Sequence, residues 1–477
     1  MTRGRTTEPA TSRRGARLAV IVGLVALFLG SLLAGWTLAD PAAFAGVVGG
    51  EVGPPAAAAL PSGTAPAASV APGATDPGPA GSTVPTAAPT ASPVPTASPA
   101  PSPSPVPAVP AAMAARLDRA LARAEKSYLL PGVEATVIFA DGSTWTGTRG
   151  MADVEAGRPV EPATPFAVAS VTKTFTSALI LRYVDQGKVR LDDRLARYVP
   201  DWPKAGSITV RMLLNHTSGI PDFFLNPKME TALNKAKKHP WTAAEILEKY
   251  VQPGAIFAPG KGWAYSNTNY LLLGVIAEQV GGAPWTTLVR QELLEPLGLD
   301  ATYVQHVETP SAEPARAYRV IVGNSGPVRQ LRSDGTDVVP FTSVVTAAGS
   351  AGAIASTTGD LARWARALYG GSLLTQATRK EMLTFVRATW YGGITAYGLG
   401  VSRVKFQGRY AYGHNGALTG SRAAIRYFPK DKITIAVAFN RETFVGDDVV
   451  GALARALFPE PAASPSPGTS AAPTTAP

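Results

Sequence analysis

The chain has 477 residues, a formal net charge of +10 and no cysteine. The lack of cysteine excludes disulfides, thiolate nucleophiles and cysteine-ligated metal sites. The positive charge suits contact with anionic envelope polymers or lipid, and it suits a merely solubilising surface equally well. The run KAKK at residues 235–238 is too short to indicate nucleic-acid binding, so we expect no nucleic-acid partner.

Two segments of low complexity bound the part of the chain that can fold. Residues 40–112 and the tail 459–477 consist mainly of Ala, Pro, Ser, Thr and Gly. Such a composition cannot bury enough apolar surface to offset the entropy of ordering, so we predict that both are disordered. The Pro density makes the first a stiff, extended linker. Residues 113–458 remain as the globular domain, which is long enough for a large core.

An apolar run lies near the N-terminus. Residues Leu18–Ala39 carry no charge and are long enough to span a bilayer. The basic residues 1–17 precede this run, so the positive-inside rule places them in the cytoplasm and the domain outside. We expect a single-pass membrane anchor. The alternative is a cleaved export signal with a cleavage site at AFA, Ala43–Ala45, and in both cases the domain is extracytoplasmic.

The first predicted elements of the domain are a helix and a hairpin. Residues 111–128 place Leu117 and Leu121 on one face, which is typical of an amphipathic helix. Residues 133–150 have the pattern of two strands joined at Asp141-Gly142, a strong hairpin signal.

A buried helix is predicted next, from Ser170 to near Gly187, because apolar residues occupy nearly all of its sides. Thr242 and Glu245 have the spacing of a capping box at the start of a further helix. Other predicted helices cover residues 268–280, 285–294, 358–369 and 447–457.

Toward the C-terminus the apolar period changes to two, which predicts strands with short links and hence an antiparallel sheet. Together with the first hairpin, these strands predict an α/β (α+β) fold. Its antiparallel sheet is built from both ends of the domain and flanked by helices, and a mostly helical domain is inserted between the two ends. The predicted strands lie within residues 396–406, 409–414, 422–428 and 433–440.

The motif S-x-x-K occurs twice, and only one copy can perform joint chemistry. Ser170 and Lys173 lie at the first turn of the predicted buried helix, where positions i and i+3 are neighbours. Ser402 and Lys405 lie in a segment of period two, where the same spacing points the side chains to opposite faces.

A serine and a lysine at this place have two readings. Desolvation lowers the pKa of a buried amine, so Lys173 could act as the base that activates the Ser170 hydroxyl, and the helix N-terminus could stabilise an oxyanion. Alternatively, Ser170 is a helix cap and Lys173 extends to the surface. The motif by itself favours the second reading.

Two further motifs follow, YSN at 265–267 and HNG at 414–416. The phenol of Tyr265 can pass protons if a neighbouring cation lowers its pKa, and Asn267 offers a donor and an acceptor to a substrate amide. His414, followed by Gly416, would line one wall of a cleft. Each motif alone is better explained as a turn or a strand end, but the three in this order favour a site.

Residues from about 113 to 458 resemble the penicillin-recognising serine hydrolases, in the branch that contains class C β-lactamases, D-alanyl-D-alanine carboxypeptidases and related esterases. The resemblance extends well beyond the three motifs. It includes TPFAVASVTKTFTSALILRYVDQGK, ITVRMLLNHTSGIPDF, FAPGKGWAYSNTNYLLLGVIAEQVGG, AAGSAGAIASTTGDLARWARAL and YGHNGALTGSRAAIRYFP.

This resemblance implies a β-lactamase/DD-peptidase-like fold and a role for each motif. Ser170 would be the acylated nucleophile and Lys173 its base, with Tyr265 as a proton shuttle. Asn267 would contact the substrate amide. His414 and Gly416 would form the third box of the substrate site, and the backbone N–H groups of Ser170 and Ala417 would form the oxyanion hole.

The third box departs from the pattern of β-lactamases, which usually carry a lysine there. A histidine is mostly neutral near pH 7, so His414 offers no permanent charge to a substrate carboxylate. This favours a peptidase or esterase over an efficient β-lactamase. His216, in LLNHTSG, is interpreted as a structural residue that shapes a loop near the cleft.

The sequence therefore predicts a membrane-anchored serine hydrolase that forms an acyl-enzyme, most similar to a D-Ala-D-Ala carboxypeptidase or a related peptidase. The alternatives are an esterase on a non-cell-wall ester, a weak β-lactamase, and a penicillin-binding sensor or scaffold that does not turn over. The expected partner is a small-molecule or peptide substrate, such as a cell-wall peptide. We expect a monomeric domain, no cofactor and no metal, since the four histidines lack ligand spacing.

Overall fold

The computed structural model describes residues 106–320, 328–388, 394–442 and 446–459. Within these residues, no helix combines the length and the apolar character needed to cross a bilayer. The expected anchor, Leu18–Ala39, lies outside the described residues, as do nearly all of the expected linker and tail.

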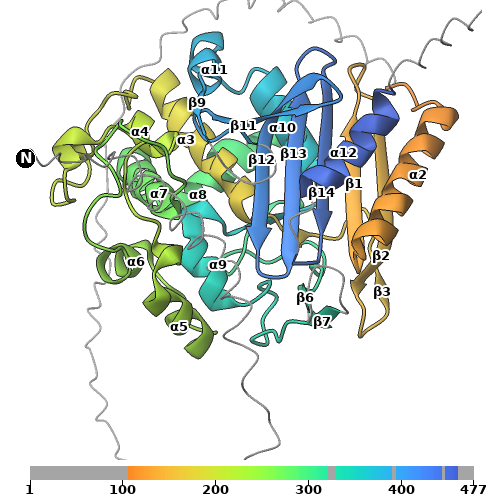
Figure 1. The fold of residues 1–477 in the computed structure, drawn as a ribbon, viewed down its shortest axis with the longest axis horizontal. Helices are drawn as coiled ribbons and strands as arrows, with labels where there is room; N and C mark the ends of the chain where they lie inside the picture. Colours follow the sequence, from red (N-terminus) through yellow and green to blue (C-terminus); the bar gives the residue numbers. More distant parts are fainter. Residues whose placement is uncertain (1–105, 321–327, 389–393, 443–445, 460–477) are drawn as a thin grey trace, which may run out of the picture. The chain divides into compact units, whose positions relative to one another are not determined.

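One large antiparallel sheet organises the domain (Figure 1). Its strand order is β3-β2-β1-β14-β13-β12-β11-β10-β9 in the described part of the chain. The first strand pairs with the last, from Val133 opposite Phe439 to Ile138 opposite Thr434, so the two ends of the domain meet in the middle of the sheet as predicted. The strands are β1 (Gly132–Ile138), β2 (Thr144–Asp153), β3 (Arg158–Pro159), β9 (Val386–Arg387), β10 (Ala396–Tyr397), β11 (Ser402–Phe406), β12 (Arg409–Leu418), β13 (Ser421–Phe428) and β14 (Ile433–Phe439).

Helices cover both faces of this sheet. On one face lie α2 (Ala111–Tyr128) and α12 (Gly446–Leu457), which share an apolar cluster with alternate residues of β1, β13 and β14 (Figure 1). On the other face α10 (Thr358–Gly370) packs against the same strands. Trp364 of α10 donates its indole N–H to the Thr174 hydroxyl of α3 (Thr172–Asp185) at 2.8 Å. Phe175 of α3 stacks on the fully buried Trp364 of α10, with ring centroids 4.0 Å apart.

The segment between the two sheet-forming ends is mostly helical, as expected. Its longest helix, α7 (Asn267–Gly281), packs along α3 and is buried on most sides. The other helices are α4 (Val210–Leu214), α5 (Pro227–Lys235), α6 (Ala243–Lys249), α8 (Trp285–Val289), α9 (Thr342–Ala348) and α11 (Gln376–Met382), with a π-helical turn at Arg290–Leu294. Short 3₁₀ turns are η2 (Ala169–Val171), η3 (Leu195–Arg197), η4 (Ala205–Ser207), η5 (Phe223–Leu225), η7 (Glu295–Leu297) and η8 (Gly349–Ala351).

Two small sheets complete the described elements. Strand β8 (Ile354–Ser356) lies between β4 (Phe166–Ala167) and β5 (Tyr303–Val304), and β6 (Tyr318–Val320) pairs with β7 (Val328–Gln330). The short β4 leads directly into the turn that carries Ser170.

Most of the predicted elements are confirmed, with three corrections. The hairpin turns at Gly142, whose φ of 91° few residues other than glycine adopt, and the capping box of Thr242 and Glu245 is formed. Residues 396–406 form two strands, separated at 398–401, and residues 285–294 form an α-helix followed by a π-helical turn. The third correction is at the start of the buried helix. The α-helix, however, begins at Thr172 and not at Ser170. Ser170 lies on the preceding turn η2 and caps no helix N-terminus by its side chain, so the cap reading of the motif is wrong.

Candidate active site

The position of Ser170 is set by a sharp turn between β4 and α3. Val168 is held to β8 by a backbone hydrogen bond to Ile354, and the next residue, Ala169, adopts a left-handed φ of 48°. That conformation costs a non-glycine residue about 1–2 kcal/mol, so the surrounding packing must stabilise it. The turn leaves Ser170 half-buried at the end of α3 while both of its neighbours are buried.

Lys173 lies one turn further on, and its side chain is fully buried. Its Nζ is 3.1 Å from Ser170 Oγ, 2.7 Å from Asn267 Oδ1 and 2.8 Å from the carbonyl oxygen of Ala351. The amine therefore has three oxygen partners, and one of them is the predicted nucleophile. The alternative in which Lys173 extends to the surface is wrong.

Burial lowers the pKa of Lys173 from its ordinary value to about 7, and the charge of Asp222 opposes part of that shift. The amine is thus neutral over the upper half of the physiological pH range. A neutral amine beside a serine hydroxyl is the arrangement that a general base requires.

Tyr265 and Asn267 reach the same place from the start of α7. The Tyr265 hydroxyl is hydrogen-bonded to the Ser170 side chain, and its ring lies 4.8 Å from Lys173 Nζ. We expected that a neighbouring cation could lower the pKa of this phenol. Burial instead raises the pKa of Tyr265 well above its ordinary value, because desolvation outweighs the other effects there. Tyr265 is therefore a neutral phenol that can relay a proton.

Strand β12 brings the third motif against the turn of Ser170. A Cβ added to Gly416 would lie 2.0 Å from the carbonyl oxygen of Val168, so only glycine permits this approach. Ala417 follows at an exposed position, next to the turn. The side chain of Asn415 points to the other face of the sheet, where it donates to Asp447 of α12 at 2.7 Å.

Both ring nitrogens of His414 are occupied by neighbours. Nδ1 is 2.6 Å from the carbonyl oxygen of Asn415 and must carry the proton, since a carbonyl only accepts. Nε2 then accepts from the hydroxyl of Tyr397 at 2.8 Å. Burial, with Lys173 nearby, lowers the pKa of His414 to about 3. His414 is thus an uncharged residue in the wall of the site, as expected for a third motif with histidine in place of lysine.

His216 is buried behind these residues and has a left-handed φ of 63°. Its Nδ1 accepts the backbone N–H of Ser266 at 3.2 Å, and its ring lies 4.3 Å from that of Tyr265. The ring therefore links its own loop to the YSN turn, which fits the structural role expected for it.

The second S-x-x-K copy behaves as predicted. Ser402 is buried and donates to the carbonyl oxygen of Gly413 at 2.9 Å, whereas Lys405 is exposed on the same strand. Their side chains cannot meet, so the spacing alone does not make a site.

Three participants were not identified from the sequence: Asp222, Tyr397 and the carbonyl of Ala351. Asp222 lies in a loop, and its Oδ2 accepts from Asn267 Nδ2 at 2.8 Å. Tyr397 lies on a two-residue strand, and Ala351 acts through its backbone. No spacing pattern marks such residues, because they reach the site only through tertiary contacts.

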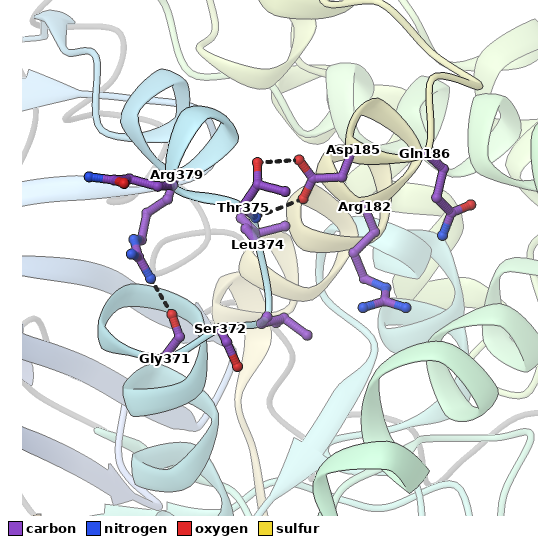
Figure 2. A pocket seen from close by; sticks show the side chains of 10 residues that line it. Arg182, Asp185, Gln186, Gly371, Ser372, Leu374, Thr375 and Arg379 are labelled. Atoms are coloured by element: carbon purple, nitrogen blue, oxygen red, sulfur yellow. Dashed lines mark hydrogen bonds between the residues drawn. The ribbon is translucent and has the colours of Figure 1, made fainter.

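A separate open cavity of about 550 Å³ lies at the far end of α3 (Figure 2). It is lined by residues that include Arg182, Asp185 and Arg379, and Asp185 is engaged there by Thr375. Ser170 and Lys173 lie at the opposite end of the helix, so this cavity is not the site of the chemistry. Among the described residues, no three His, Asp or Glu side chains are grouped to hold a metal ion.

Comparison with known proteins agrees with this fold. The beta-lactamase family model matches residues 117–459. The chain is 29% identical over 342 residues to penicillin-binding protein 4* of Bacillus subtilis, covering 68% of this chain and 72% of that protein. It is 30% identical over 255 residues to the D-alanyl-D-alanine-carboxypeptidase/endopeptidase AmpH of Escherichia coli, covering 50% of this chain and 59% of that protein.

The crystal structure of a D-stereospecific amidohydrolase from Streptomyces is also similar. The TM-score is 0.61 at 29% identity, over 73% of this chain and 98% of that one. The chain belongs to the β-lactamase family of penicillin-recognising serine hydrolases. It is a serine hydrolase with the fold of that family.

The close approach at Gly416 generates a prediction. Gly416→Ala should reduce the rate at which a fluorophosphonate probe labels the enzyme by about 100-fold, because shifting β12 by an ångström misplaces the reacting groups. Labelling is measured by in-gel fluorescence with time. Gly206→Ala is the matched control, since a Cβ there meets nothing within 4 Å and should leave the rate unchanged. Equal rates for the two variants would contradict the importance of this contact.

Proposed function

We propose that the enzyme hydrolyses peptide or amide bonds on the carbonyl side of a D-amino acid, through an acyl-enzyme on Ser170, without requiring a free carboxylate in the leaving group. The observation that carries the chemistry is the buried amine of Lys173, 3.1 Å from Ser170 Oγ. The observation that carries the substrate class is His414, whose two ring nitrogens are both engaged within the protein.

The acylation step follows from these contacts. Neutral Lys173 takes the Ser170 proton as Oγ attacks the substrate carbonyl carbon, and the oxyanion that forms is held by the backbone N–H groups of Ser170 and Ala417. The proton passes from Lys173 through Tyr265 to the leaving nitrogen as the C–N bond breaks. Water then attacks the ester and gives its proton to the same pair, which releases the acid and restores Ser170.

The preference for D-configured substrates is supported by what the relatives are named for. One is a D-alanyl-D-alanine-carboxypeptidase/endopeptidase, and a structural neighbour is a D-stereospecific amidohydrolase. A carboxypeptidase must recognise the terminal carboxylate, and a charge-assisted anchor serves that purpose best. The neutral His414 provides no such anchor, and this favours an amidase or peptidase of broader leaving-group choice.

Substrate comparison tests this proposal. An N-acylated D-Ala-D-Ala peptide and the same peptide with a C-terminal amide should have kcat/KM values within about 3-fold, since the neutral His414 offers no charge that would distinguish the two C-termini. Ser170→Ala should abolish both activities and all fluorophosphonate labelling.

Other results would replace the proposal with a specific alternative. A preference of about 30-fold or more for the free carboxylate would indicate a carboxypeptidase. Hydrolysis of esters alone would indicate an esterase. Turnover of a penicillin would indicate a weak β-lactamase. Stable penicillin labelling of Ser170 without turnover would indicate a sensor.

The pH dependence follows from the state of Lys173. Its pKa is lowered to about 7, so the amine is protonated and inactive below that pH and neutral above it. Hence kcat/KM should rise with pH and reach half its plateau near pH 7. The histidines do not account for such a limb, because the pKa of His414 is about 3 and that of His216 is also lowered by burial. The buried Asp222, whose pKa is raised to about 6, titrates just below Lys173. A kcat/KM that stays constant from about pH 5.5 to about pH 9 would contradict the assignment of Lys173 as base.

We also propose that the enzyme is held at the outer face of the membrane by Leu18–Ala39, and the length and apolar character of that run support this. The full chain, expressed in a bacterial host, should sediment with membranes and resist extraction by carbonate. A chain starting at residue 40 should remain in the supernatant. Release of a mature form beginning after Ala45 would show instead that the run is a cleaved signal.

A further inference from the structure

Asp222 is a buried carboxylate next to the catalytic residues that does not touch Ser170 or Lys173 by any hydrogen bond among the described residues. It is 8% exposed and caps the turn η5, where Oδ1 accepts the backbone N–H of Phe224 at 3.1 Å. Its other oxygen, Oδ2, accepts from Asn267 Nδ2 at 2.8 Å. Its route to the reacting groups therefore runs through Asn267.

This contact determines which way the Asn267 amide faces. Burial raises the pKa of Asp222 to about 6. Above that pH the group is a carboxylate, which can only accept hydrogen bonds, so the NH₂ end of Asn267 must lie toward it. The oxygen end must then lie toward Lys173, where Oδ1 is 2.7 Å from Nζ. Without Asp222, the amide could rotate by half a turn and present its NH₂ group to Lys173 instead.

The orientation matters because a neutral amine has two N–H donors and one lone pair. Two of the three partners of Lys173, Asn267 Oδ1 and the Ala351 carbonyl, are pure acceptors and take the two N–H groups. The lone pair is left for the third partner, the Ser170 hydroxyl at 3.1 Å. A reversed Asn267 amide would donate to that lone pair, and the base would be blocked.

We propose that Asp222 is a positioning residue for acylation: it holds the Asn267 amide so that the Lys173 lone pair points at Ser170 Oγ. This inference rests on the proposed role of Ser170 as nucleophile and of Lys173 as base.

The charges around Lys173 determine a second measurable quantity, which is the pH at which the rate falls on the acid side. Its amine faces the rings of Tyr265 and Tyr270 at 4.8 and 5.4 Å, and the buried His216 and His414 lie near enough for its charge to lower their pKa values. Asp222 is the group whose negative charge raises the pKa of Lys173. Removing that charge should therefore lower the pKa of Lys173 further and shift the acid limb of the rate to lower pH.

The experiment compares Asp222→Asn with wild type. In wild type, the two carboxylate oxygens accept from the backbone N–H of Phe224 and from the NH₂ group of Asn267. The amide that replaces the carboxylate has only one oxygen for these two donors. If that oxygen caps Phe224, its NH₂ opposes that of Asn267 and forces the reversal. We expect fluorophosphonate labelling of Ser170 to slow by about 10- to 100-fold at its optimal pH, as for loss of a general base's alignment. We also expect the acid limb to move below that of wild type.

The matched control is Asn226→Ser, in the same loop. Asn226 is also a buried helix cap, 9% exposed, whose Oδ1 accepts from the backbone of Lys228 at 3.0 Å. It makes no contact with the catalytic residues in the described structure, since its Nδ2 donates to the carbonyl of Tyr250. This variant should label at the wild-type rate, with its acid limb at the same pH as in wild type. Serine can still cap the helix, so the melting temperature of the variant reports the cost of losing the hydrogen bond to Tyr250 in this loop.

The outcomes separate the inference from the proposed function. If wild type itself is not labelled, the proposed function fails. If wild type is labelled and Asp222→Asn, folded by its melting temperature, matches it in rate and acid limb, the positioning role is wrong. A loss of labelling that Asn226→Ser shares, with no shift of the limb in either variant, would show that Asp222 is merely structural.

Discussion

The site depends on the burial of one amine. Lys173 places its Nζ in the apolar centre of the domain, fully removed from water. An ammonium group there is costly, and the protein compensates for this with three oxygen acceptors and one nearby carboxylate while still lowering the pKa to about 7. Burial disfavours the charged form of Lys173, and it thereby leaves a neutral amine that can act as a base. Tyr265 is a neutral phenol and His414 a neutral imidazole for the same reason.

The fold provides this burial by bringing distant segments together. The turn of Ser170 is held between β8 and β12, and β12 belongs to the C-terminal half of the large sheet. The helix that carries Lys173 packs along α7, and its Phe175 stacks on Trp364 of α10, which packs against β1 and β14. Because β1 and β14 pair with each other, the two ends of the domain must be joined before the wall of the site is complete. The geometry of the nucleophile is therefore a property of the whole domain.

The elements with strong local signals could be predicted from the sequence. The hairpin at Gly142, the capping box of Thr242 and the amphipathic helix α2 each depend on neighbours a few residues away, and each is present. Helix α3 begins two residues later than the sequence predicts, because the left-handed Ala169 that sets the turn is stabilised by packing and has no sequence signal. Asp222 has no sequence signal for a similar reason, since its partner Asn267 is 45 residues away.

The sequence by itself determined the class of chemistry. S-x-x-K together with YSN, HNG and the wider resemblance of residues 113–458 to the penicillin-recognising serine hydrolases indicates a serine hydrolase. The copy at Ser402 could be excluded from its period of two alone. Only the tertiary structure decided the protonation and orientation of the groups. Whether Lys173 is neutral, which way Asn267 faces and whether His414 can bind an anion depend on desolvation and on hydrogen-bond partners. These are set by residues far apart in the chain, which the fold alone brings within reach.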